Sequence, residues 1–203
     1  MNLGGKVTEE VPIYALDTCI VIDAIQEHRK WGPEIEPVLS DAQAGLVRIL
    51  VSEITVAEAC KLTKGDLSEE ERANQVRAID EFFRNSYILR RAVTSRESNL
   101  AAKLIREHNI DTCDSIIAAT SLLHGATCLY THDGLKANGK KKKLSGLDGK
   151  LEHNGATLSI EQPNAAKYKG HELWAASDES EGKNEQQEIG SEEAGANARD
   201  TQS

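Results

Sequence analysis

The chain has 203 residues, of which 39% are hydrophobic and 28% are charged, and its net charge is −9. This length suits one domain of ordinary size, and this composition excludes a fibrous or wholly disordered chain. No run approaches the roughly 18 apolar residues that a membrane-spanning helix needs. The polar, acidic start does not resemble a secretory signal, so we expect a cytoplasmic protein without membrane contact.

The negative charge is concentrated at the C-terminal end. Residues 170–203 hold nine acidic and two basic residues, so most of the net charge lies there. This segment is also rich in Gly, Ser, Asn and Gln, and it cannot bury enough apolar surface to offset the entropy of ordering. The sequence therefore predicts an N-terminal extension over 1–12, a domain over 13–162 and a disordered acidic tail over 163–203. The rest of the chain is nearly neutral, which leaves a nucleic-acid substrate open.

In the first half of the chain, apolar runs alternate with helical patterns. Residues 13–22 form a β-rich run typical of a strand buried on both faces, and a helical stretch follows through about residue 44. Residues 47–54 predict a second strand and residues 55–64 a helix. An amphipathic helix over 68–85 opens with the spacing of a capping box.

The second half repeats this alternation. It predicts a strand over 87–93, a helix from Thr94 to about His108, and a helix over 112–124 that Gly125 closes. Strands follow over 127–131 and 156–160. Strands separated by helices indicate an α/β fold, a three-layer α/β/α sandwich with a central, mainly parallel sheet. The carboxyl ends of its strands then share one edge, where ligands bind in such folds.

Four carboxylates fall at ends of these elements. Asp17 interrupts the first apolar run, Glu58 follows the second strand, Asp114 lies in a helix start, and Asp133 follows the fourth strand. Each also has an ordinary alternative. Asp17 and Asp114 suit helix starts, Glu58 completes a capping box that begins at Thr55, and Asp133 precedes a glycine in a turn pair.

Gathered at one edge, these carboxylates would repel each other strongly unless a cation lay between them. Their oxygens suit Mg²⁺ or Mn²⁺, whereas the scattered cysteines and histidines lack zinc-site spacing. Such an ion would activate a water molecule and neutralise charge on a phosphodiester. The residues predict a divalent-metal site and leave open whether it holds one ion or two.

The segments LDTCIVID, TVAEAC, DTCDSIIAATSLLHGAT and YTHD, in this order, resemble the PIN-domain family, and within it the VapC-type toxin ribonucleases. The resemblance covers about residues 13–162. It implies a PIN-like fold and Mg²⁺-dependent endonucleolytic cleavage of RNA. It assigns the catalytic, metal-binding positions to Asp17, Glu58, Asp114 and Asp133. It assigns the hydroxyls that orient a carboxylate or a water to Thr18 and Thr131.

The resemblance also implies partners, namely an RNA substrate, an antitoxin protein and a second copy of the chain. The chain departs from compact toxins in its tail and in an insertion that carries Lys140, Lys141, Lys142 and Lys143. These lysines are either a solvated loop or a nucleic-acid contact near the site.

Other functions explain the acids less well. A haloacid-dehalogenase-like phosphatase needs a second Asp two residues after Asp17, where Cys19 stands, and a response-regulator receiver needs an adjacent acidic pair near its first strand. A catalytically silent PIN-like module that binds nucleic acid or a protein partner remains the alternative. The histidines, among them His124 and His132, are interpreted as surface or loop residues.

Overall fold

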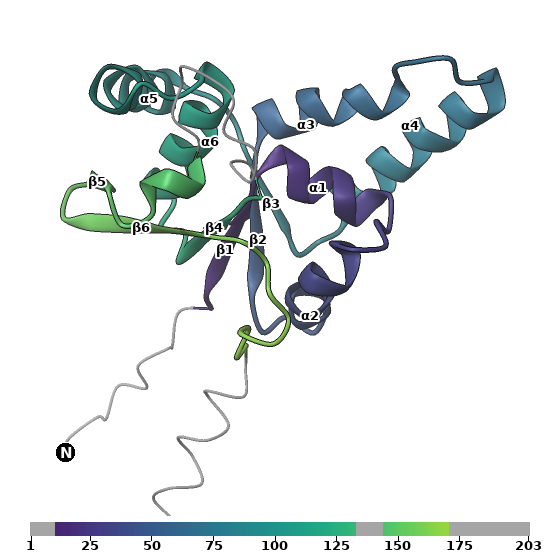
Figure 1. The fold of residues 1–203 in the computed structure, drawn as a ribbon, viewed down its shortest axis with the longest axis horizontal. Helices are drawn as coiled ribbons and strands as arrows, with labels where there is room; N and C mark the ends of the chain where they lie inside the picture. Colours follow the sequence, from purple (N-terminus) through teal and green to yellow (C-terminus); the bar gives the residue numbers. More distant parts are fainter. Residues whose placement is uncertain (1–10, 133–143, 171–203) are drawn as a thin grey trace, which may run out of the picture. The chain divides into compact units, whose positions relative to one another are not determined.

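A computed structural model describes residues 11–132 and 144–170 of the chain. In this part, six strands form one sheet in the order β3-β2-β1-β4-β6-β5 (Figure 1). The strands are β1 (Ile13–Leu16), β2 (Arg48–Ser52), β3 (Ile88–Arg91), β4 (Cys128–Tyr130), β5 (Leu151–His153) and β6 (Ala156–Glu161). All neighbouring pairs are parallel except β5 with β6.

Six α-helices connect these strands in the described ranges. They are α1 (Thr18–Ile25), α2 (Gly32–Gln43), α3 (Glu53–Ala59), α4 (Glu69–Arg84), α5 (Ser95–His108) and α6 (Thr112–Leu123). Two short 3-10 helices, η1 (Cys60–Thr63) and η2 (Leu144–Leu147), complete the elements. Within residues 11–132 and 144–170, none of the helices combines the length and apolar character that crossing a bilayer requires.

The helices cover both faces of the sheet, each over its own apolar core. Figure 1 shows α5 and α6 on one face and α1 to α4 on the other. On the first face, Leu104 and Ile117 pack against Leu129 of the sheet. On the second, Ile20 and Phe83 belong to a separate buried cluster. The predicted three-layer α/β/α sandwich with a mainly parallel sheet is therefore confirmed.

The parallel strands bring their carboxyl ends to one edge of the sheet. Pairing continues just beyond the strands, because the Asp17 N–H donates to the Tyr130 carbonyl at 3.0 Å and the Thr131 N–H donates to the Glu161 carbonyl at 2.9 Å. Asp17 and Thr131 are thus fixed by backbone bonds at adjacent positions of this edge. Only parallel order across β1, β4 and β6 gives this arrangement.

The first apolar run is not a single strand. The prediction of a strand through residue 22 was wrong, because β1 ends at Leu16 and α1 begins at Thr18. Asp17 has extended backbone angles, and its side chain accepts from the Thr18 N–H as a helix N-cap. The remaining apolar residues, such as Ile20 and Val21, are buried from a helix instead.

Two further features differ from the sequence prediction. Strand β5 was not predicted, because it has only three residues and buries only Leu151 fully. Beyond residue 162, the chain still contacts α2: the Tyr168 hydroxyl donates to Asp41 Oδ2 at 2.9 Å, and the Ala165 N–H donates to Glu34 Oε2 at 2.9 Å. The packed part of the molecule therefore extends past residue 162.

The capping box predicted for the helix over 68–85 is present at the start of α4, and a second one is present at the start of α5. In the second, Glu97 is only 3% exposed and accepts from the N–H and hydroxyl of Thr94. His124, at the end of α6, lies with Nε2 3.4 Å from Glu97 Oε1. Glu97 thus holds the start of α5 against the end of α6, the helix that carries Asp114.

The ionised form of Glu97 should stabilise the fold at neutral pH. Burial raises its pKa, but the hydrogen bonds from Thr94 outweigh burial and lower the pKa from 4.5 to about 2. Because the folded pKa lies below the unfolded one, this stabilisation is complete above pH 4.5 and is lost as the pH falls toward 2. We expect Glu97→Gln to lower the free energy of unfolding at pH 7 by about 1–3 kcal/mol, because buried donors lose their charged partner, and to change it little at pH 2.

Urea denaturation across this pH range measures the effect. Glu36→Gln, an exposed glutamate on α2, is the matched control and should follow the wild-type pH profile. A difference between wild type and Glu97→Gln that stays constant from pH 7 to pH 2 would show that the charge of Glu97 does not stabilise the fold.

Candidate active site

Asp17 is a buried carboxylate at the centre of the carboxyl edge, with 5% of its surface exposed. Its Oδ1 accepts from the Thr18 N–H at 2.6 Å, and its Oδ2 accepts from the Thr131 hydroxyl at 2.7 Å. The Cys19 thiol donates to Oδ2 at 3.3 Å. Asp17 therefore caps the start of α1 and also lies at the carboxyl ends of the strands.

The Cys19 thiol beside Asp17 is unsuited to be a nucleophile. Burial raises its pKa far above the ordinary range, and the neighbouring charge of Asp17 raises it further. The protonated thiol can only donate a weak hydrogen bond to the carboxylate.

Glu58 lies beside Asp17, and Thr18 connects the two. The Thr18 hydroxyl donates to Glu58 Oε2 at 2.8 Å, while its N–H binds Asp17. The predicted capping box that begins at Thr55 was wrong, because α3 begins at Glu53 with Ser52 as its N-cap. Glu58 therefore lies beyond the first turn of α3, and its side chain, 18% exposed, faces α1.

Lys61 supplies positive charge to this pair of carboxylates. Its ammonium lies 2.5 Å from Glu58 Oε1, and its side chain is 56% exposed. The hydrogen bond to Glu58 raises the pKa of Lys61, and the charge of Asp17 adds to the shift. The two carboxylates therefore share a field that favours a cation.

Asp114 lies in the first turn of α6, as the sequence predicted. The preceding residue shows that this helix start is close to Glu58. Burial raises the pKa of the Cys113 thiol, and the charges of Glu58 and Asp111 raise it further. The N-terminal end of α6 thus belongs to the same edge as α3, and its dipole favours carboxylates there.

Asp133 and Lys140–Lys143 lie outside the described residues. Within residues 11–132 and 144–170, no group of three or more His, Cys, Asp or Glu side chains is close enough to hold a metal ion. The predicted four-carboxylate cluster, which includes Asp133, therefore stays a prediction. The described residues bring together Asp17 and Glu58, whose oxygen donors match Mg²⁺ or Mn²⁺ in type.

His132 is a residue of this edge whose packing the sequence did not predict. Its Nε2 lies 2.8 Å from Oδ2 of the buried Asp23, and its ring stacks on Trp31 with centroids 5.0 Å apart. Burial raises the pKa of Asp23, and the neighbouring His132 and His28 oppose this shift. His132 lies in the loop after β4, as interpreted from the sequence, but its side chain is only 16% exposed because partners from α1 and the start of α2 cover it.

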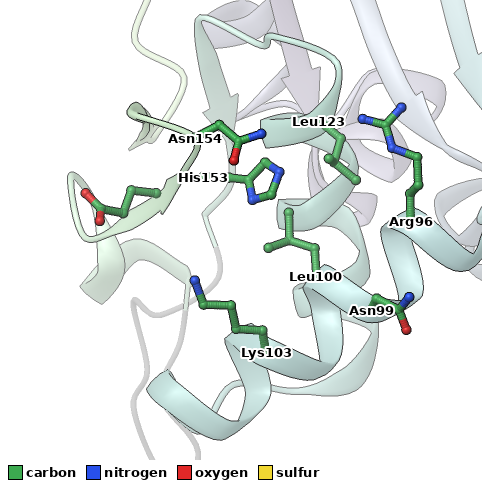
Figure 2. A pocket seen from close by; sticks show the side chains of 8 residues that line it. Arg96, Asn99, Leu100, Lys103, Leu123, His153 and Asn154 are labelled. Carbon is green, nitrogen blue, oxygen red and sulfur yellow. The ribbon is translucent and has the colours of Figure 1, made fainter.

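A cavity of about 510 Å³ lies between α5 and the β5–β6 hairpin. Figure 2 shows Leu100 and Lys103 projecting from α5 toward His153. Its described lining residues include none of the four predicted acids. The carboxyl edge around Asp17 therefore remains the candidate active site.

A family model described as "PIN domain" matches residues 14–135. No curated protein matches the sequence significantly.

Several solved structures are similar to this chain. VapBC2 from Rickettsia felis, bound to a promoter DNA fragment, has 22% identity and a TM-score of 0.46, covering 59% of this chain and 86% of that one. DNA-bound VapBC from Salmonella typhimurium has 16% identity and a TM-score of 0.49, covering 73% and 98%. VapC20 from Mycobacterium tuberculosis, described as a sarcin-ricin loop cleaving toxin, has 13% identity and a TM-score of 0.48, covering 60% and 90%.

The bond from Thr131 to Asp17 gives a prediction about stability. Thr131→Val keeps the shape of the side chain but removes the donor to a buried carboxylate oxygen. We expect the free energy of unfolding at pH 7 to fall by about 1–3 kcal/mol, because the oxygen loses a partner that water cannot replace. Urea denaturation measures the change.

Thr157→Val, an exposed position on β6, is the control and should lie within about 0.5 kcal/mol of wild type. If Thr131→Val were as stable as this control, the hydroxyl would not be needed to hold Asp17 in place.

Proposed function

Because this chain belongs to the PIN-domain family, we propose that it is an endonuclease that hydrolyses phosphodiester bonds in RNA with the help of a bound divalent metal ion. The observation that carries the proposal is the pairing of Asp17 and Glu58 through Thr18 at the carboxyl edge. Two carboxylates held this close, with an ammonium against one of them, suit a site that stabilises positive charge.

In this proposal, the ion is Mg²⁺ or Mn²⁺, and its ligands are Asp17, Glu58, Asp114 and Asp133. When bound, the ion supplies positive charge that polarises the phosphodiester and favours ionisation of the attacking water. Thr131 holds the Asp17 carboxylate in one orientation, as Thr18 does for Glu58. Such outer hydrogen bonds fix the geometry of metal-binding carboxylates.

A second candidate function is a catalytically silent module that binds nucleic acid or a protein partner. It is favoured by one observation, namely that the described residues do not form a group of three metal-binding side chains. The two functions make opposite predictions for cleavage and similar ones for RNA binding. A proposal that follows the resemblance to VapC-type toxins adds an antitoxin protein and a second copy of the chain as partners.

Loss of a carboxylate should abolish cleavage. Purified protein is incubated with labelled RNA or single-stranded DNA in Mg²⁺, Mn²⁺ or EDTA. We expect metal-dependent cleavage of RNA, and a fall of at least about a hundredfold in Asp17→Asn and Asp114→Asn, because even residues outside the ligand shell cost 10–100-fold when removed. Asn also caps helices, so Asp17→Asn should keep the fold.

Asp66→Asn makes the same chemical change at an exposed position and should cleave like wild type. Circular dichroism and thermal melting confirm that each variant is folded. Wild-type protein that binds RNA but cleaves none with any metal would support the silent module instead. Full activity in either Asp17→Asn or Asp114→Asn would remove that residue from the proposed site.

The lysine segment is proposed to contact phosphates. Replacing Lys140–Lys143 with serine should weaken RNA binding and flatten its dependence on salt, by about 0.7 in log–log slope for each lysine that contacts a phosphate. Fluorescence anisotropy of labelled RNA measures this slope. The salt concentration is varied between about 50 and 200 mM, the range in which such contacts weaken.

A control with equal loss of charge replaces four exposed cations on other elements: Lys64, Arg72, Arg77 and Lys103. It should keep the wild-type slope. Equal slopes for wild type and the Lys140–Lys143 variant would show that these lysines do not contact phosphates and favour the interpretation as a solvated loop.

A further inference from the structure

A cavity of about 390 Å³ opens beside the candidate active site. This volume lies in the range of about 300–1,000 Å³ that is usual for small-molecule sites. It combines one aromatic wall with carboxylates, two amides and a cation. Its lining includes Trp31, Glu34, Asp148, Glu161 and Lys167.

Thr131 connects this cavity to the catalytic edge. Its hydroxyl donates to Asp17 Oδ2 at 2.7 Å, and its N–H donates to the carbonyl of Glu161, a lining residue, at 2.9 Å. The next residue, His132, stacks on Trp31, which also lines the cavity. A ligand in this cavity would thus be separated by Thr131 from Asp17, a carboxylate that the proposed cleavage uses.

The aromatic wall is held in a fixed orientation. Trp31 and His132 are nearly coplanar, with an interplanar angle of 4°, and His132 is in turn held by Asp23 at 2.8 Å. The Lys30 ammonium lies over the Trp31 ring, 4.3 Å from its centre, so a base that stacks on the indole would take the place of this ammonium. A fixed indole is a surface on which unpaired bases stack in proteins that bind single-stranded nucleic acid, and the displaced cation can then contact a phosphate.

The carboxylates of the cavity are oriented by the backbone. Glu34 Oε2 accepts from the Ala165 N–H at 2.9 Å, and Asp148 Oδ1 accepts from the Ile160 N–H at 2.8 Å. A carboxylate has about four acceptor positions, so each can still accept bonds from a ligand. Glu34 lies in the first turn of α2, three residues after Trp31, and it is less exposed than Asp148 or Glu161.

These features select one kind of base. Guanine presents two neighbouring donors on its Watson–Crick edge, N1–H and N2–H, which match the two oxygens of a carboxylate. Adenine and cytosine place an acceptor beside their single amino group, and uracil flanks its one N–H with two carbonyls. A carboxylate would repel the lone pairs of those three edges.

We infer that this cavity binds a guanine base of single-stranded RNA, stacked on Trp31 and hydrogen-bonded to Glu34, and so selects where the chain cleaves. The inference deepens the proposed function and rests on it for the choice of RNA. Lys167 is an exposed cation of the cavity lining, and Lys30 is an exposed cation over the Trp31 ring. They offset the acidic lining of the cavity and can contact the phosphates on either side of the base.

Binding of single nucleotides tests the inference without cleavage. The chain has two tryptophans, so the full-length Trp174→Phe variant reports on Trp31 alone. Its fluorescence is titrated with GMP, AMP, CMP and UMP in EDTA, and N-acetyltryptophanamide corrects for light absorbed by the nucleotides. We expect saturable quenching by GMP, with a Kd at least about tenfold below that of UMP, in line with the loss of a charge-assisted hydrogen-bond pair.

Two matched variants identify the carboxylate. Glu34→Gln should remove the preference for GMP, whereas Glu36→Gln, an exposed residue of the same helix, should keep it. In equilibrium dialysis with labelled GMP, Trp31→Ala should bind about tenfold more weakly than wild type because the stacking surface is lost. Equal affinity for all four nucleotides, or no quenching by any, would overturn the inference. A preference for GMP that survives in Glu34→Gln would overturn the role of Glu34.

The nucleotide-binding experiment and the cleavage assay can each fail without the other. Selective GMP binding by a protein that cleaves no RNA would contradict the proposed nuclease activity but would still support the guanine site. RNA cleavage without any preference for guanine next to the cut, together with equal nucleotide affinities, would contradict the guanine site and leave the nuclease standing.

Discussion

The carboxylate of Asp17 has to be stabilised in a place where water barely reaches it, and much of the local structure follows from that constraint. An ionised carboxylate is costly to bury unless donors surround it. Here the donors come from the start of α1 and from the residue after β4. The same carboxylate therefore ends β1, starts α1 and ties two neighbouring strands together. A parallel sheet is what makes these donors meet at one edge.

The residues that hold Asp17 also connect it to its surroundings. Thr18 extends the network to Glu58 on α3, and Thr131 extends it to the carbonyl of Glu161 after β6. The chain thus places charge-stabilising carboxylates on one side of Thr131 and an aromatic, carboxylate-lined cavity on the other. In the proposed function the first side supports hydrolysis, and in the inferred guanine site the second side selects the base. Both depend on backbone positions that the sheet fixes, so neither needs a large rearrangement to form.

Local patterns predicted the layers, the parallel sheet and the capping box of α4 correctly, because those features depend on neighbouring residues. They failed where distant residues decide the outcome. The apolar run after Asp17 is compatible with a strand or a helix, and the hydrogen bond from the Thr18 N–H to the Asp17 side chain favours the helix. Glu58 was given a capping box because nothing nearby reveals its contact with Thr18. The packing of His132 on Trp31 joins residues about a hundred positions apart, so no sequence window contains it. The predicted metal-binding role of Asp133 stays a prediction.

The most direct test of the account is to locate a metal ion. Crystals grown with Mn²⁺ can be measured at a wavelength where manganese scatters anomalously, which identifies the ion without reference to activity. The account predicts an anomalous peak at the carboxyl edge, with oxygens of Asp17 and Glu58 among the ligands and the Lys61 ammonium displaced from Glu58. Manganese that binds elsewhere, with Lys61 still on Glu58 and no peak beside Asp17, would contradict it.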